Sequence, residues 1–184
     1  MRQSRWLILS TMAVLACSAP LDTTAPLEPM ALAECTLNSD RVPPQAPLDS
    51  STPDSRWAEA ARQVPGGWGG LFFEDKALTV YLVDPRQQVE AAQALLEFGI
   101  GISGARVKQG RWDFGQLFDW HFYIKSQLGD EEIVVTSSDI DEVRNRLVYG
   151  VVDEETQRTT ITFLGSLDLP CELVMLEVRG FFHY

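Results

Sequence analysis

Residues 78–85 read Leu-Thr-Val-Tyr-Leu-Val-Asp-Pro, and this stretch decides the fold prediction. Its alternating run up to Val83, with β-branched and aromatic side chains, predicts a strand. Asp84 can cap the free amides of a following helix, and Pro85 fits the first helical turn without losing a hydrogen bond. The stretch therefore predicts a strand that leads directly into a helix.

The flanking residues extend this prediction to a β-β-α-β unit. Residues 68–73 indicate a first strand, and Glu74-Asp75-Lys76 indicates a turn. Gly99 ends the helix, and residues 102–109 indicate a closing strand. A short helix over 56–64 precedes the unit. The apolar stripe of the main helix consists of Val89, Ala92, Leu95 and Leu96.

A shift of 69 residues maps this unit onto a second copy. The helix-capping aspartate coincides in both copies, which makes a duplication persuasive. The matched pairs are Leu78 with Leu147, Val83 with Val152, Asp84 with Asp153, Gln88 with Gln157, and Leu95 with Leu164. The second unit is predicted to have strands at 133–137, 146–152 and 172–178, a turn region from Asp139 to Arg144, and a helix over about 154–167.

An aromatic-rich helix over 113–128 joins the two units. Its inward face consists of Phe114, Leu117, Phe118, His121, Ile124 and Leu128. Short strand pairs with helices on one face predict an α+β fold with small antiparallel or mixed sheets. The pseudo-repeats cover about 68–109 and 131–179 of a globular domain at 56–184.

Composition excludes several classes of protein. The chain has 184 residues, 45% of them hydrophobic, so it can bury a core. Its net charge of −11 argues against a nucleic-acid partner, because phosphates would be repelled. After the N-terminal apolar run, no stretch is long and apolar enough to span a membrane.

The N-terminus indicates export. Arg2 and Arg5 precede an apolar run over 6–16, which is too short to span a bilayer and typical of a signal peptide. The run ends at Val14-Leu15-Ala16-Cys17, which resembles a lipobox of bacterial lipoproteins. This resemblance implies cleavage after residue 16, lipidation of Cys17 and, because Ser18 follows, an outer-membrane location. The alternative is an ordinary secretory signal cut near Ala19.

Residues 17–55 form the predicted membrane tether. This segment is rich in Pro, Ser, Thr and Ala, a composition typical of a disordered, semi-stiff spacer. If Cys17 carries lipid, Cys35 and Cys171 remain as an even pair in an oxidising compartment. They either form a disulfide between the tether and the loop before the last strand or stay unpaired.

Catalytic and metal motifs are weak in this sequence. Gly99, Gly101 and Gly104 match G-x-G-x-x-G, but a helix precedes them and a strand follows, the reverse of a dinucleotide site. Ser103 lacks the setting of a nucleophile, and His183 is interpreted as a tail residue. The acidic residues Asp139, Asp141 and Glu142 lack the spacing of a calcium loop, and no metal or cofactor is expected. His121 is predicted to be a core or interface histidine.

Three segments carry a resemblance to a known family. They are residues 69–75, residues 80–85 and especially residues 139–151, Asp-Ile-Asp-Glu-Val-Arg-Asn-Arg-Leu-Val-Tyr-Gly-Val. Over about 56–180 the chain resembles the non-catalytic N-terminal domain of secreted bacterial trypsin-like serine proteases, similar to the alpha-lytic protease prodomain. Such domains assist folding of the attached protease and can inhibit it by docking a strand edge. No protease domain follows before Tyr184, so any such partner is expected to act in trans.

Two functions are compatible with these features. The first is a non-enzymatic envelope lipoprotein that binds a secreted protease or another envelope protein, or assists its folding, through exposed strand edges and an apolar patch. The expected edges are residues 102–109 and 172–178, the second being favoured. The alternative is a small envelope hydrolase that uses His121 with nearby carboxylates. No recognisable nucleophile motif is present, which favours the first.

Overall fold

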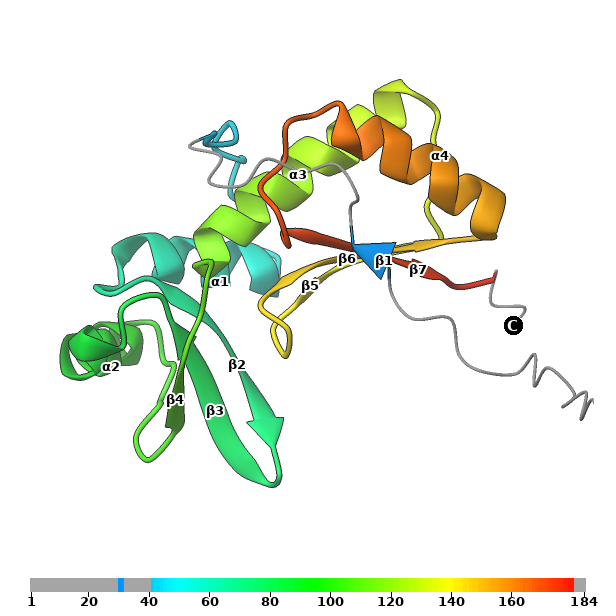
Figure 1. Cartoon of the computed structure of the whole chain (residues 1–184). Coiled ribbons are helices and arrows are strands. Elements are labelled where there is room, and N and C mark those ends of the chain that lie inside the picture. The colour runs from blue at the N-terminus through cyan, green and yellow to red at the C-terminus, as the bar shows by residue number, and fades with distance from the viewer. Residues whose placement is uncertain (1–29, 32–40, 181–184) are drawn as a thin grey trace, which may run out of the picture.

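The computed structural model describes residues 30–31 and 41–180, which form two small mixed sheets and four α-helices (Figure 1). The first sheet has the order β2-β3-β4, with β2 at Trp68–Glu74, β3 at Ala77–Leu82 and β4 at Arg106–Gln109. The second has the order β1-β7-β6-β5, with β1 at Met30–Ala31, β5 at Ser137–Asp141, β6 at Arg146–Val151 and β7 at Val174–Val178. The helices are α1 at Pro53–Gln63, α2 at Gln88–Glu97, α3 at Phe114–Asp130 and α4 at Glu154–Gly165, with a 3₁₀ turn, η1, at Pro85–Gln87. The α+β class is confirmed.

The predicted duplication is present in the topology. In each unit an antiparallel hairpin is followed by a helix and a strand parallel to the second hairpin strand. Thr79 pairs with Arg106 in the first unit, and a shift of 69 residues takes them onto Val148 and Met175, which also pair. Asp84 and Asp153 each accept a hydrogen bond from a backbone amide at the start of the following helix. The two units therefore share connection and register.

The hairpin loops differ, and one predicted strand is wrong. Asp75 and Lys76 alone connect β2 to β3, and both have positive φ. The loop from β5 to β6 spans 142–145 instead, and β5 lies at Ser137–Asp141, not at 133–137. Asp139 and Asp141 therefore lie in the strand, where Ile140 between them supplies the buried side chain. Antiparallel pairing with β6, from Ser137 with Gly150 to Asp141 with Arg146, sets the bounds of this strand, and the apolar run at 133–135 lies outside it.

Other boundaries move for local reasons. Helix α1 begins at Pro53 because Thr52 caps it by accepting a hydrogen bond from the Ser55 amide. Strand β7 begins two residues later than predicted, after Glu172, whose φ is +65°. On α2, Ala91 and Leu95 face the core, whereas Val89 and Leu96 are 66% and 65% exposed. The predicted stripe of α2 is thus only partly buried, and two of its apolar side chains face solvent.

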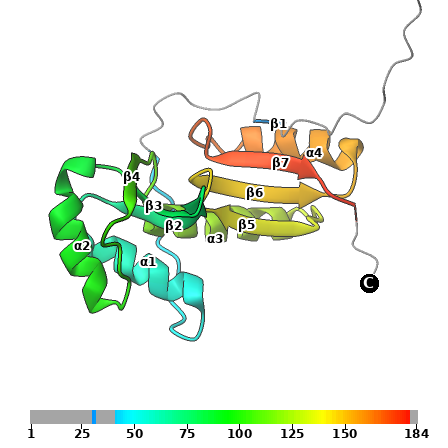
Figure 2. The same ribbon diagram turned by 90° about the horizontal axis from the view of Figure 1, so that it is seen from below.

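The core lies between the sheets and the helices. Val80 and Leu82 of β3, and Leu147 and Tyr149 of β6, are fully buried on the faces turned to the helices. Helices α3 and α4 lie over one face of the second sheet (Figures 1 and 2). In the first unit an aromatic cluster of Trp57, Trp68 and Phe114 connects α1, β2 and α3. The opposite face of each sheet is here called the open face. It carries Tyr81 in the first sheet and Arg146 in the second, together with the buried side chains of Thr79 and Val148.

The ordered domain begins earlier than residue 56. Pro43 and Ala46 are buried, although the sequence places them in the tether. The Ala46 amide donates a hydrogen bond of 2.9 Å to the Asp119 carboxylate, which also pairs with Arg62. A polar clamp between α1 and α3 therefore holds this segment. Residues 1–29 and 32–40, which contain the predicted signal peptide, Cys17 and Cys35, lie outside the described residues, as does His183.

Candidate functional site

The two units meet at a seam that consists of Gly69, Gly110, Arg111, Trp112 and Asn145. The Asn145 side chain, 5% exposed, accepts hydrogen bonds from the Arg111 and Trp112 amides at 2.8 and 3.0 Å. It donates to the carbonyls of Trp112 and Gly69 at 2.9 and 3.3 Å. One side chain of the second unit thus satisfies backbone groups of the first unit and of the segment that leads into α3.

Glycines of β2 allow this close approach. A Cβ on Gly69 would lie 2.6 Å from the Trp112 carbonyl and 2.7 Å from the Asn145 amide nitrogen. Gly70, at φ +106°, lies against the Glu142 side chain. Two of the segments that carry the sequence resemblance, 69–75 and 139–151, therefore contact each other in the folded chain. Asn145 lies within the segment 139–151, but the sequence pattern did not indicate its role.

Beside the seam is a cavity of about 170 Å³, here called the seam pocket. It lies where the open faces of the two sheets meet, and Tyr81 donates a hydrogen bond to the Val143 carbonyl there. Three guanidinium groups line it, with Glu172 as the lining carboxylate. The lining residues are Tyr81, Gln109, Gly110, Arg111, Trp112, Arg144, Asn145, Arg146 and Glu172. The sequence pattern did not reveal this pocket, because its arginines come from two segments that lie far apart in the sequence.

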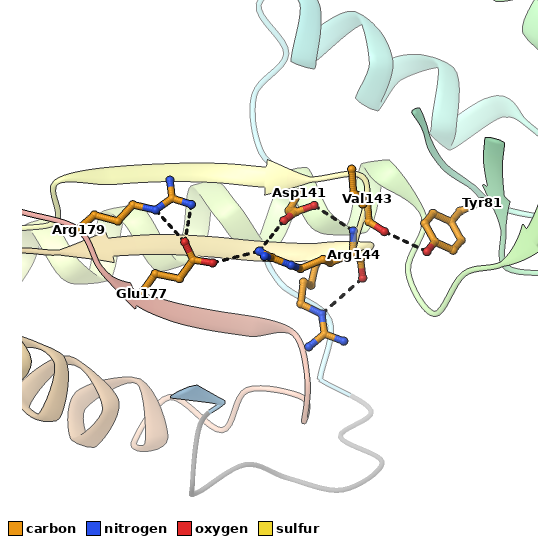
Figure 3. A network of polar contacts seen from close by, with 7 residues as sticks. Tyr81, Asp141, Val143, Arg144, Glu177 and Arg179 are labelled. Carbon is orange, nitrogen blue, oxygen red and sulfur yellow. Dashed lines mark hydrogen bonds and ion pairs between the residues drawn. The ribbon is translucent and has the colours of Figure 1, made fainter. Parts of the chain in front are cut away.

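A charge network extends from the pocket along the second sheet (Figure 3). Arg144 pairs with Asp141 of β5 and with Glu177 of β7, at 2.9 and 3.1 Å. Glu177 also binds Arg179. Arg111 pairs with Glu172 at 2.9 Å, and its guanidinium lies 5.1 Å from the Trp112 ring. These pairs are partly exposed, so their main effect is to position the side chains.

His121 is partly buried on α3 and contacts the second sheet. Its ring lies 5.9 Å from the ring of Tyr149, edge to face, and the Tyr149 hydroxyl donates to the His121 carbonyl at 3.4 Å. Burial lowers the pKa of His121, and Lys125 adds to this effect. Within the described residues, the buried Nε2 has no hydrogen-bond partner. Packing therefore orients the ring, and burial disfavours its charged form.

The second hairpin carries the acidic residues Asp139, Asp141 and Glu142. No three or more His, Cys, Asp or Glu side chains in the described ranges are arranged to hold a metal ion. Burial raises the pKa of Asp139 and of Glu142, and the neighbouring carboxylates add to the rise. Asp141 is the carboxylate that pairs with Arg144. Mutual repulsion and partial burial thus dominate this cluster.

The glycine motif at 99–104 is a helix end and connector. Gly99 and Gly104 have φ of +74° and +76°, and a Cβ at any of its glycines would meet nothing within 4 Å. Such open surroundings differ from a phosphate cradle, in which backbone amides converge on a ligand. Ser103 lies in the same connector, and no hydrogen bond joins its side chain to another described residue.

Of the two strand edges expected to be exposed, one is open. β4 pairs with β3 and has no other neighbour among the described strands. β7 is different, because β6 pairs with one side and β1 with the other, Met30 with Leu176 and Ala31 with Met175. The second edge is therefore partly covered, which corrects the preference for residues 172–178. β1, β2 and β5 are the other outer strands among those described.

Of the two cysteines in the predicted disulfide, the structure describes Cys171. Cys171 is 5% exposed and disulfide-bonded, while its predicted partner Cys35 lies outside the described residues.

Helices in the described part of the chain are all too short or too polar to cross a membrane.

The geometry defines a tandem β-β-α-β domain with a polar seam, a small cationic pocket and an open edge at β4. No family model matches this chain. Nor does any curated protein match it in sequence.

Proposed function

We propose that the chain is a non-enzymatic bacterial envelope lipoprotein whose domain binds another envelope protein, or assists its folding, through the edge of β4. The observation that carries the proposal is that β4 ends its sheet without a neighbour among the described strands. An unpaired edge offers a row of backbone donors and acceptors to an extended segment of a partner. A secreted protease acting in trans remains the partner class that the sequence resemblance implies.

The charge of β4 favours an acidic partner segment. Arg106 and Lys108 lie on its open face, since they pair with Thr79 and Tyr81. Lys108 bonds Glu74 at 2.6 Å, and Arg106 is exposed. On a chain of net charge −11, this local positive charge orients an acidic segment toward β4.

Charge reversal at β4 tests this proposal. Arg106→Glu is expected to reduce the amount of partner that co-purifies from crosslinked envelopes at least several-fold, because it sets like charges against the partner. Arg158→Glu is the matched control, since Arg158 is an exposed arginine on α4. Equal recovery with both folded variants would contradict docking at β4.

The membrane anchor is tested separately. If Cys17 carries lipid, Cys17→Ser releases the chain from washed membranes, since acyl chains supply the anchor. Full membrane retention of this variant would exclude the lipid anchor.

The position of His121 supports a binding role over hydrolysis. No described hydroxyl or thiol lies within hydrogen-bonding distance of its Nε2, so an activated nucleophile is not formed there. His121→Gln is expected to change stability and leave any activity of the chain intact. A turnover of ester, peptide or glycoside substrates that is present in the wild type and lost in the folded variant would establish the hydrolase alternative.

A further inference from the structure

We propose that the seam pocket is a binding site for a single carboxylate, with Arg146 as its principal ligand. This inference is independent of how a partner docks at β4. It rests on the charge balance, the free donors and the size of the pocket.

The charges around the pocket leave one arginine unpaired. Arg111 is neutralised by Glu172. Arg144 and Arg179 together are balanced by Asp141 and Glu177. Arg146 forms no ion pair with any described residue, and only its Nε is engaged, by donating to the Arg144 carbonyl at 3.4 Å. The pocket thus has an excess of one positive charge.

The excess of one positive charge favours a carboxylate as the ligand. A carboxylate carries a single negative charge and matches the excess, whereas a phosphate near neutral pH carries more. The terminal nitrogens of Arg146 have no partner among the described residues. A guanidinium fork binds a carboxylate through two parallel hydrogen bonds. Glu172 already contacts Arg111 at the same wall, so the pocket chemistry is suited to carboxylates.

The dimensions fit the end of a peptide or an acidic side chain. A volume of about 170 Å³ exceeds the share of a single water, about 30 Å³, several-fold. It accommodates a carboxylate with its adjoining carbon atoms. Tyr81 and Trp112 supply partly apolar walls next to the guanidinium groups.

Three short peptides distinguish the sources of the carboxylate. Acetyl-Ala-Ala has a free C-terminal carboxylate, acetyl-Ala-Glu-amide has a side-chain carboxylate, and acetyl-Ala-Ala-amide has neither. Each is titrated at low salt into the full ¹⁵N-labelled chain in mild detergent, and the amides of Gly110, Arg111 and Trp112 are monitored. At least one carboxylate peptide is expected to shift these amides saturably, and the neutral peptide is not. The peptide that binds more tightly identifies the source.

Two substitutions with opposite expected effects test the role of the arginines. Arg146→Gln is expected to weaken binding about tenfold or more, because the unpaired charge and the fork are lost. Glu172→Gln is expected to strengthen binding, because it removes the internal carboxylate that competes for Arg111. Arg158 is exposed on α4 and does not line the pocket, so Arg158→Gln is expected to leave binding unchanged.

Three results would overturn the proposal. They are equal shifts with the neutral peptide, tighter binding of inorganic phosphate than of either carboxylate peptide, and unchanged affinity in a folded Arg146→Gln variant. Because Glu172→Gln removes a charge without removing a positive ligand, it provides a second test if Arg146→Gln fails to fold. Weaker binding by Glu172→Gln would contradict the assigned charge balance.

Discussion

Asn145 and Lys76 occupy equivalent positions in the two units, both with positive φ, yet they have different roles. Lys76 is exposed in a two-residue turn, whereas Asn145 is buried and bonds four backbone groups across the seam. Asn tolerates the left-handed region better than most residues, and its amide both donates and accepts. A single residue therefore ends one hairpin and joins the two units.

Replacing Asn145 should be costly for the fold. We expect Asn145→Ala to destabilise the chain by about 3 kcal/mol, because buried backbone groups lose their partners. Lys76→Ala is the control for side-chain removal at the equivalent turn position. Lys already carries a Cβ in the left-handed region, so this change should alter stability by less than about 0.5 kcal/mol. Urea unfolding measures both. Equal losses would show that the seam bonds of Asn145 do not determine the effect.

His121 should make the fold sensitive to mild acid. Burial lowers the pKa of His121 in the folded chain. In the unfolded chain a histidine has a pKa near 6.5 and so binds a proton at pH values at which the folded His121 does not. Stability is therefore lost as the pH falls below about 6.5, by at most about 1.4 kcal/mol per pH unit.

The variant His121→Phe should remove this contribution. Acidification also stabilises the fold through Asp139 and Glu142, whose pKa values are raised in the folded chain. Wild type and variant are therefore compared at the same pH. Urea midpoints at pH 7.5 and 5.5 should fall further in the wild type than in the variant. Parallel changes would contradict a neutral folded His121.

At the scale of elements, the duplicated units differ mainly in the length of the hairpin loop. The loop of two residues in the first unit becomes four in the second, which carries Asn145 and Glu142 toward β2. The strand–cap–helix signal predicted β3, β6, α2 and α4 well, because it is local. Loop length, the placement of β5 and the partner of Asn145 are tertiary, so sequence patterns did not determine them.

Residue 69 should not accept a side chain, because β2 lies in close contact with the second unit there. Gly69→Ala places a Cβ at 2.6 Å from a carbonyl oxygen and is expected to cost about 1–3 kcal/mol. Gly101→Ala is the matched control, since nothing lies within 4 Å of its added Cβ, and it should change stability by less than about 0.5 kcal/mol. Thermal unfolding of both variants decides the comparison. A neutral Gly69→Ala would show that the seam is loosely packed.

At the scale of the molecule, the segment before α1 is part of the domain rather than only a spacer. Residues 41–52 pack onto α1 and α3, and β1 pairs with β7 (Figure 2). The Pro-rich composition predicted a tether, because it contains few apolar residues. Specific polar contacts, such as that of Ala46 with Asp119, are not visible in composition.

The predicted Cys35–Cys171 disulfide would join the tether to the loop before β7. Cys171 is buried and disulfide-bonded, whereas Cys35 lies outside the described residues. Such a bridge would stabilise the chain by up to about 4–5 kcal/mol in the chain-entropy model. Titration of unfolded, unreduced periplasmic material should find no free thiol. Two reactive thiols per chain would contradict the bridge.

Site-specific photo-crosslinking in intact cells tests most directly the proposed binding of a partner along β4. A photoreactive residue replaces Arg106 in one variant and Arg158 in a control. We expect a discrete adduct from position 106 and none from position 158, because only the first lies on the open edge of the first sheet. Absence of an adduct at 106, or equal adducts from both positions, would contradict the account.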